Sequence, residues 1–225
     1  MRKILFSLVL LLALLLAAEV GVTLLSQHGM ERALRSQYDL PTSLESSINS
    51  FPFLVSLARN HMSEVRLSWS GDLQYQAGEG AVENLVYLGS VVLYDVELNV
   101  SSLLKGKLEI RHVSRQKAAI SIDAEGLGRA CGLRQGALFI ANDMIFVEID
   151  GEKTQYKVKV SGDHSLTLEP YGASSVGTGL GSNPYAEVKT IVFDALPLGA
   201  TLLNASVNRD RVQIEMSIPM WEGYL

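Results

Sequence analysis

The sequence contains a single cysteine, Cys131, among 225 residues. A lone cysteine excludes an intramolecular disulfide framework and a cysteine-rich zinc site. The chain also lacks any block of lysine and arginine, and its formal net charge is −5 at pH 7. Because proteins bind the phosphates of nucleic acid through clustered cations, nucleic acid is not an expected partner.

Sequence patterns of known catalytic sites are missing as well. No Gly-x-Ser-x-Gly elbow occurs, and the glycine run Gly177–Gly181 is followed by Asn183 and Pro184, which favours a flexible linker over a phosphate loop. The four histidines lie on four different predicted elements without metal-ligand spacing. The sequence therefore predicts no catalytic residue, no metal and no cofactor, and we do not expect an enzyme.

A long apolar run stands at the N-terminus. Arg2 and Lys3 precede uninterrupted apolar residues from Ile4 to Ala18, and a lone Glu19 separates these from Val20–Leu25. Cations before an apolar helix are typical of an export signal or a membrane anchor, because the positive end stays on the cytoplasmic side. Residues 1–25 are therefore predicted to be a signal peptide or a signal anchor, and the rest of the chain to be exported.

Cleavage of this segment stays open. The pattern of small residues that a signal peptidase requires is poorly met around Leu16, Ala17 and Ala18. An uncleaved helix from Ile4 to Leu25 would be about 33 Å long, close to the roughly 30 Å hydrocarbon core of a bilayer. Glu19 is the obstacle to a span, and it is tolerated best near the outer interface.

Helical spacing continues just after the apolar run. Met30, Ala33, Leu34 and Tyr38 predict a short amphipathic helix over Ser26–Tyr38. A strand is expected over residues 42–49, a second helix over residues 54–62, and short helical segments over residues 101–104 and 123–133.

From Glu64 onwards, apolar and polar residues alternate, which is typical of strands with one face in an apolar interior. Val92, Tyr94, Val96, Leu98 and Val100 are predicted to share one face, and Ile120 and Ile122 repeat the pattern. Asp150-Gly151 predicts a tight hairpin. We therefore expect residues 26–225 to form a single α+β domain with a strongly twisted antiparallel sheet, and residues 171–183 to form a Gly/Ser-rich loop.

The alternation allows two interpretations of the interior. Long strands with a continuous apolar face can curl around a helix and leave a groove that holds an acyl chain, each buried methylene contributing about 0.8 kcal/mol. The same faces can instead fill a dry core, and periodicity alone favours the dry core.

Several segments resemble the LmeA family of phospholipid-binding bacterial cell-envelope proteins. These are the N-terminal segment, the Phe51-Pro52-Phe53-Leu54 step, Val91–Leu104 with Lys105-Gly106 behind it, and Leu196-Pro197-Leu198-Gly199 before a strand that ends near Ile218. The resemblance implies an elongated fold like that of tubular lipid-binding proteins, with sheet wrapped around a long helix. It also implies a non-catalytic phospholipid-binding protein at the periplasmic or outer face of the membrane, linked to the maturation of envelope glycolipids and lipoglycans.

On this basis we expect an exported, membrane-associated protein whose apolar groove takes phospholipid acyl chains. The hypothetical groove residues are Phe51, Phe53, Leu54, Leu57, Val92, Tyr94, Val96, Leu98, Ile120 and Ile122. Hypothetical head-group contacts are Arg59, His61 and Lys105, which lie near predicted element ends.

Two alternatives remain open from the sequence. A membrane-anchored scaffold or assembly factor with a solid core would bind another envelope protein, and a sealed interior would favour it. An enzyme acting on envelope glycans or lipids would need acidic or histidine side chains that converge in one cleft.

Overall fold

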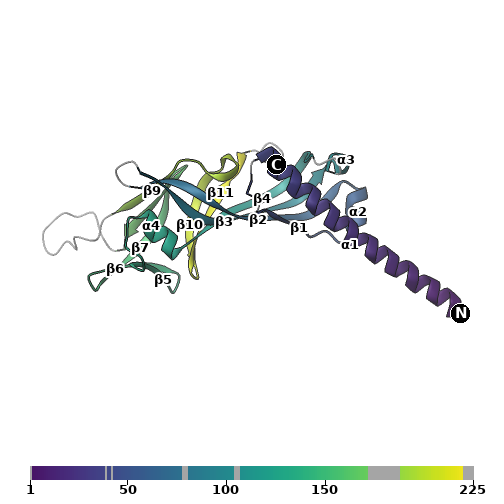
Figure 1. Cartoon of the computed structure of the whole chain (residues 1–225), viewed down its shortest axis with the longest axis horizontal. Helices are drawn as coiled ribbons and strands as arrows, with labels where there is room; N and C mark the ends of the chain where they lie inside the picture. The colour runs from purple at the N-terminus through teal and green to yellow at the C-terminus, as the bar shows by residue number, and fades with distance from the viewer. Residues whose placement is uncertain are drawn as a thin grey trace. The chain divides into compact units, whose positions relative to one another are not determined.

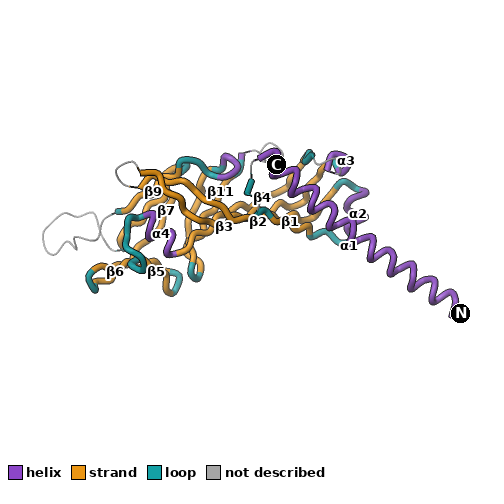
Figure 2. Tube along the Cα trace, in the orientation of Figure 1, coloured by secondary structure: helices purple, strands orange, loops and turns teal. Residues whose placement is uncertain are grey.

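The computed structural model describes residues 2–38, 40–41, 43–77, 81–103, 107–171 and 188–219. They form an α+β structure built mainly from antiparallel strands, with one long helix at the N-terminus (Figures 1 and 2). The chain divides into two compact units. Unit 1 is made mainly from Met1–Trp69 and Val91–Gln116, and unit 2 from Ser70–Ser90 and Lys117–Met220.

The strands form one hydrogen-bonded sheet in the order β10-β11-β4-β3-β2-β9-β8-β7-β6-β5, and β1 pairs with β2. Their bounds are β1 Glu45–Ile48, β2 His61–Ala77, β3 Ala81–Leu98, β4 Ile110–Asp123, β5 Leu138–Ala141, β6 Met144–Ile149, β7 Glu152–Gly162, β8 Ser165–Pro170, β9 Lys189–Phe193, β10 Thr201–Asn208 and β11 Arg211–Ser217. The helices are α1 Arg2–Tyr38, α2 Phe53–Ala58, α3 Val100–Leu103, α4 Ala124–Ala130 and the 3-10 turn η1 Pro197–Gly199. Strands β2, β3 and β4 each run through both units. The assignment of residues 26–225 to a single domain stays a prediction.

In unit 1, the C-terminal half of α1 packs against β1, α2 and α3. Met30, Ala33 and Leu34 are buried on one face of the helix, as their helical spacing predicts. Glu31 fixes β1 beside this face, because its Oε1 accepts hydrogen bonds from the backbone N–H of Ser46 at 2.9 Å and from the Ser46 hydroxyl at 3.2 Å. The predicted amphipathic segment is therefore confirmed, as a continuation of the apolar helix.

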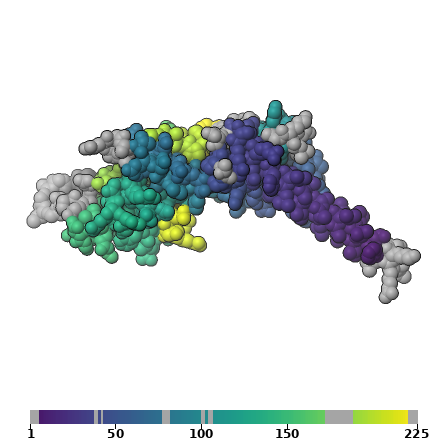
Figure 3. All heavy atoms as spheres, viewed as in Figure 1, coloured from purple at the N-terminus to yellow at the C-terminus, as the bar shows by residue number. Residues whose placement is uncertain are grey.

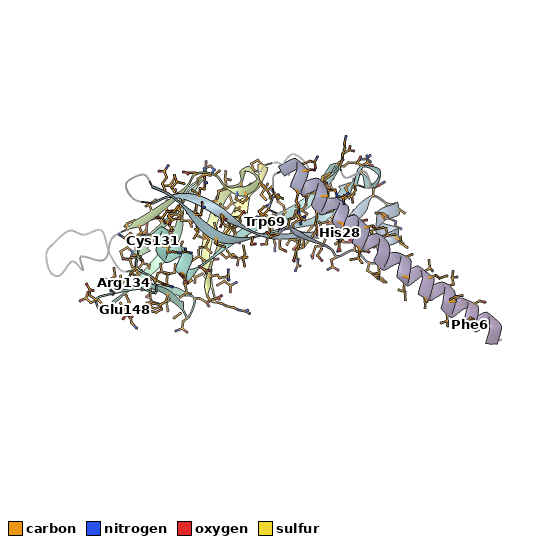
Figure 4. All side chains as sticks on the ribbon, viewed as in Figure 1. Phe6, His28, Trp69, Cys131, Arg134 and Glu148 are labelled. Carbon is orange, nitrogen blue, oxygen red and sulfur yellow. The ribbon has the colours of Figure 1, made fainter. Side chains whose placement is uncertain are left out.

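The N-terminal half of α1 has no such packing. Every described side chain from Phe6 to Ala18 is exposed, around the whole circumference of the helix. Figure 3 shows this purple segment extending from the rest of unit 1 as a single rod, and Figure 4 shows the Phe6 side chain far from any neighbouring element. Burial begins at Ser26, one residue after the apolar run ends.

Unit 2 is a nearly closed, barrel-like sheet. Its strands bury Tyr75, Ile120 and Ile214, and β4 pairs with β11 so that Ile120 lies opposite Ile214. Closure comes from β10, the last strand of the hydrogen-bonded path, which lies against β7. The helix α4 follows β4 directly, since Asp123 caps it by accepting a hydrogen bond from the backbone N–H of Gly126 at 2.7 Å.

The Asp150-Gly151 hairpin is confirmed. Both residues have positive φ, 52° for Asp150 and 84° for Gly151, as a two-residue turn with the twist of the flanking strands requires. The ladder begins at once, with Ile149 opposite Glu152. Strands β6 and β7 are thereby placed side by side.

The predicted single face of Val92, Tyr94, Val96 and Leu98 is wrong. Val91 and Leu93 are buried just before Asp95 in β3, whereas Val96 and Leu98 are buried just after it. Asp95 has a φ of 50°, which adds one residue to the alternation and turns the following side chains over. Val92 and Tyr94 consequently point away from the face that Val96 and Leu98 occupy.

Other expectations differ from the structure in extent. The second helix ends at Ala58, because Asn60 has a φ of 54° and β2 begins at His61. Wrapping of the sheet around a long helix is not confirmed, since α1 keeps Arg32, Ser36 and Gln37 exposed beside its buried face. The loop predicted over residues 171–183 lies outside the described residues apart from Tyr171.

Candidate functional site

A hollow of about 410 Å³ lies between β7 and β10 of unit 2. Small-molecule sites in proteins span roughly 300–1,000 Å³, so the hollow is large enough for one acyl chain or a comparable group. Buried or half-buried apolar side chains line it from both strands, namely Tyr156, Val158, Ala205 and Val207. The lining also includes Lys157 and Lys159, which are exposed.

The hollow exists because two strand edges meet without pairing. From Tyr156 to Gly162, β7 pairs with β8 on one edge, and its ladder with β6 ends at Tyr156. The other edge of this segment faces β10, which pairs with β11 on its own far side. We call the facing edges of Tyr156–Gly162 and Thr201–Asn208 the seam.

Hydrogen bonds close the seam at both of its ends. At one end, the backbone N–H of Leu202 donates to the carbonyl oxygen of Asp163 at 2.8 Å. At the other end, the backbone N–H of Arg209 donates to Oδ1 of Asp143 at 2.8 Å. Between these bonds the described residues of the two strands do not pair in the sheet, and residues of both strands line the hollow.

Two cations lie at the seam. The Lys157 ammonium is 4.2 Å from the centre of the Tyr171 ring, a cation–π distance. The Lys159 ammonium pairs with the Glu169 carboxylate at a side-chain exposure of 56% for the lysine, so solvent screens the pair. Because both lysines point outwards while Tyr156 and Val158 point inwards, the seam offers positive charge beside an apolar opening.

A second hollow, of about 420 Å³, lies at the β10–β11 turn. Its lining is polar and charged, with Arg209, Asp210 and Arg211 among its residues. Such a lining does not favour an acyl chain, because ionic and polar groups would lose hydration against methylenes.

The predicted groove residues are divided between the two units. Eight of the ten lie in unit 1, and Ile120 and Ile122 lie in unit 2. Phe53, Val96, Leu98, Ile120 and Ile122 are buried core residues, whereas Phe51 is 83% exposed. Leu54, Leu57, Val92 and Tyr94 are half-buried. Their role in lipid binding stays a prediction.

Two of the three predicted head-group residues, Arg59 and His61, lie just after α2. Arg59 is the exposed C-terminal cap of this helix, and His61 begins β2 with its Nε2 3.8 Å from Oδ1 of Asp95. Lys105 lies outside the described residues. Contact of these side chains with a head group also stays a prediction.

Sequence reasoning missed the lysines and small residues of the seam. The alternation of β7 indicates that Val158 faces inwards and Lys157 and Lys159 outwards, which the structure confirms. The same alternation carries no information on which strand the free edge of β7 meets. The partner, around Ala205, follows more than forty residues later in the chain.

Reactive groups are sparse among the described residues. No group of three or more His, Cys, Asp or Glu side chains is arranged to hold a metal ion there. Burial raises the pKa of the Cys131 thiol to about 12, so the thiol is protonated at neutral pH and is a weak nucleophile. That the protein is not an enzyme stays a prediction.

One helix in the described part of the chain, within Phe6–Gln37, is long and apolar enough to cross a membrane. Glu19, the acid that interrupts its apolar run, is bound to the start of α2. The Glu19 carboxylate accepts hydrogen bonds from the backbone N–H of Phe53 and, at 3.0 Å, from that of Leu54. Two N–H groups that the start of α2 would leave without helical partners are satisfied in this way.

Comparison with known proteins identifies a family for most of the chain. Residues 17–217 match the family described as LmeA-like phospholipid-binding. No curated protein and no solved structure matches the chain.

Proposed function

Because this chain belongs to the LmeA-like phospholipid-binding family, we propose that it binds a phospholipid at the seam between β7 and β10. The observation that carries the proposal is the hollow, which opens between two unpaired edges and is lined by Tyr156, Val158, Ala205 and Val207. An acyl chain placed there would gain about 0.8 kcal/mol for each methylene that leaves water.

The polar end of the lipid is assigned to the outer side of the seam. The ammonium groups of Lys157 and Lys159 can attract a phosphate without entering the apolar interior. Glu169 partly neutralises Lys159, so the attraction is modest and falls with ionic strength. Asp143, at the end of the seam, carries a negative charge that repels a phosphate. The surroundings of Lys157 are therefore the better place for an anion.

We further propose that α1 holds the protein at a membrane. The support is the fully exposed apolar surface from Phe6 to Ala18 behind Arg2 and Lys3, an arrangement whose exposure to water is unfavourable. Export, location at the outer face of the membrane and a part in envelope glycolipid maturation belong to the same proposal, and the last rests on the family resemblance alone.

Photo-crosslinking of the full chain tests the proposal. The protein is reconstituted into liposomes that carry a phospholipid with a photoreactive acyl chain, illuminated and digested, and the modified peptides are identified by mass spectrometry. We expect crosslinks in β7 and β10 as well as in α1. Crosslinks confined to α1 would mean that lipid serves only as the anchor, and the function would pass to the scaffold alternative with an envelope protein as partner.

A further inference from the structure

The start of α2 carries exposed apolar side chains beside the anchor helix. Phe51 is 83% exposed and Val55 is 46% exposed, while Phe53 between them is buried. Figure 1 shows α2 next to α1, and the two helices are in contact. Because α2 contacts α1, these side chains add to the exposed apolar surface of α1, and a large exposed apolar surface indicates an interaction site.

The bonds to Glu19 fix the height of α2 along α1. Because the N–H groups of Phe53 and Leu54 both donate to the Glu19 carboxylate, the start of α2 must lie level with Glu19. The Thr23 hydroxyl donates to the Glu19 carbonyl oxygen at 2.7 Å, so the helix continues regularly past this point. Any membrane that reaches Glu19 also reaches the start of α2.

Helix length decides whether a membrane reaches that far. At about 1.5 Å per residue, a hydrocarbon core of about 30 Å takes about 20 residues. Counted from Lys3 at the cytoplasmic interface, the outer boundary of the core falls near residue ~23, beyond Glu19. Exposed Val20, Leu24 and Leu25 are consistent with a boundary in this region.

We propose that the segment Phe51–Val55 dips into the outer leaflet beside α1 and forms a second membrane contact. The occupant of this apolar surface is the lipid bilayer, because the surface is continuous in height with the part of α1 assigned to the membrane. Glu19 enters the leaflet with its carboxylate bound by two backbone N–H groups rather than bare. This inference rests on the proposed anchoring by α1.

Depth-dependent fluorescence quenching tests the contact in the full chain. Cys131→Ser removes the single native thiol. One new cysteine is then added in each variant, at Phe51→Cys, Val55→Cys, Leu12→Cys or Ser68→Cys, and it is labelled with an environment-sensitive fluorophore. Each protein is reconstituted into vesicles of phosphatidylcholine with a minority of phosphatidylglycerol, containing lipids with a nitroxide either near the head group or deep in the acyl chain. Ser68 is the matched control, since it is exposed on β2 of the same unit.

We expect the probes at Phe51→Cys and Val55→Cys to emit at shorter wavelength than the probe at Ser68→Cys. Nitroxides near the head group should quench these two probes several-fold more strongly than they quench the probe at Ser68→Cys. The Leu12→Cys probe reports the anchor through quenching by deep nitroxides. If Leu12→Cys is quenched while Phe51→Cys and Val55→Cys behave like Ser68→Cys, the second contact is overturned and the anchor stands. If Leu12→Cys is not quenched either, the anchoring premise itself fails.

Discussion

The two units close the same kind of sheet in different ways. In unit 1, the helix α1 packs against the sheet, and its side chains Met30 and Leu34 are buried at this contact. In unit 2, the sheet curls until β10 meets β7, and the meeting is incomplete, so a hollow remains. Alternating apolar residues build both interiors. Whether such an interior is dry or open depends on what covers its last edge.

The largest expected effect lies in the helix-closed unit. Leu34→Ala removes a buried side chain from the contact face of α1 and should lower the free energy of unfolding by about 3 kcal/mol, because it leaves a cavity that the packed surroundings cannot fill. Chemical denaturation followed by circular dichroism measures the change. Arg32→Ala on the exposed face of the same helix is the control and should cost less than about 0.5 kcal/mol. Equal losses for both variants would mean that α1 does not close this interior.

The second effect concerns the open seam. Ala205→Trp fills the hollow from β10 and should reduce photo-crosslinking of lipid to unit 2 by about tenfold, equivalent to about 1.4 kcal/mol of binding. The matched control is Leu203→Trp, since Leu203 lies on the same strand, is exposed and does not line the hollow. Thermal denaturation confirms that both variants fold. Undiminished crosslinking in folded Ala205→Trp would contradict binding at the seam.

Much of this fold could be predicted from the sequence because its signals are local. The apolar run with Glu19, the spacing of Met30 to Leu34 and the Asp150-Gly151 turn each act within a few residues. The face of β3 was mispredicted because the left-handed backbone at Asp95 shifts the alternation by one residue, and aspartate is only weakly diagnostic of that conformation. The seam could not be predicted, since it depends on a contact between β7 and β10 that no local pattern encodes.

The third effect is electrostatic and smaller. Replacing both seam lysines, Lys157→Glu with Lys159→Glu, should weaken binding of an anionic phospholipid about fivefold at low salt and much less at high salt, because the exposed charges are screened. Competition between anionic and zwitterionic photoreactive lipids measures the preference. Lys153→Glu is the control, as Lys153 lies earlier on β7, pairs with Glu148 and does not line the hollow. A salt-independent loss, or the same loss in Lys153→Glu, would argue against a head group at the seam.

The smallest expected effect concerns β2, which buries different kinds of residue in the two units. The unit 1 part of this strand buries Val65 and Leu67, whereas the unit 2 part buries Tyr75, whose hydroxyl donates to Oε2 of Glu83 at 2.6 Å. Burial, with help from the Glu83 carboxylate, raises the pKa of Tyr75 from 10.0 to about 12. The native state therefore resists ionisation of Tyr75, and its stability is fully present below pH 10 and declines as pH rises from 10 towards 12.

Tyr75→Phe should therefore be less stable than the parent at pH 8 by about 0.5 kcal/mol, the lower range for a hydrogen bond whose exposed acceptor can turn to water. Because the phenylalanine cannot ionise in the unfolded chain, the order of the two stabilities should reverse between pH 10 and 12. Denaturation of both proteins across this range measures the crossing. Glu83→Gln should keep most of the alkaline decline, since burial is the larger cause of the raised pKa. Parallel pH profiles for Tyr75→Phe and the parent would show that unit 2 does not hold Tyr75 away from water.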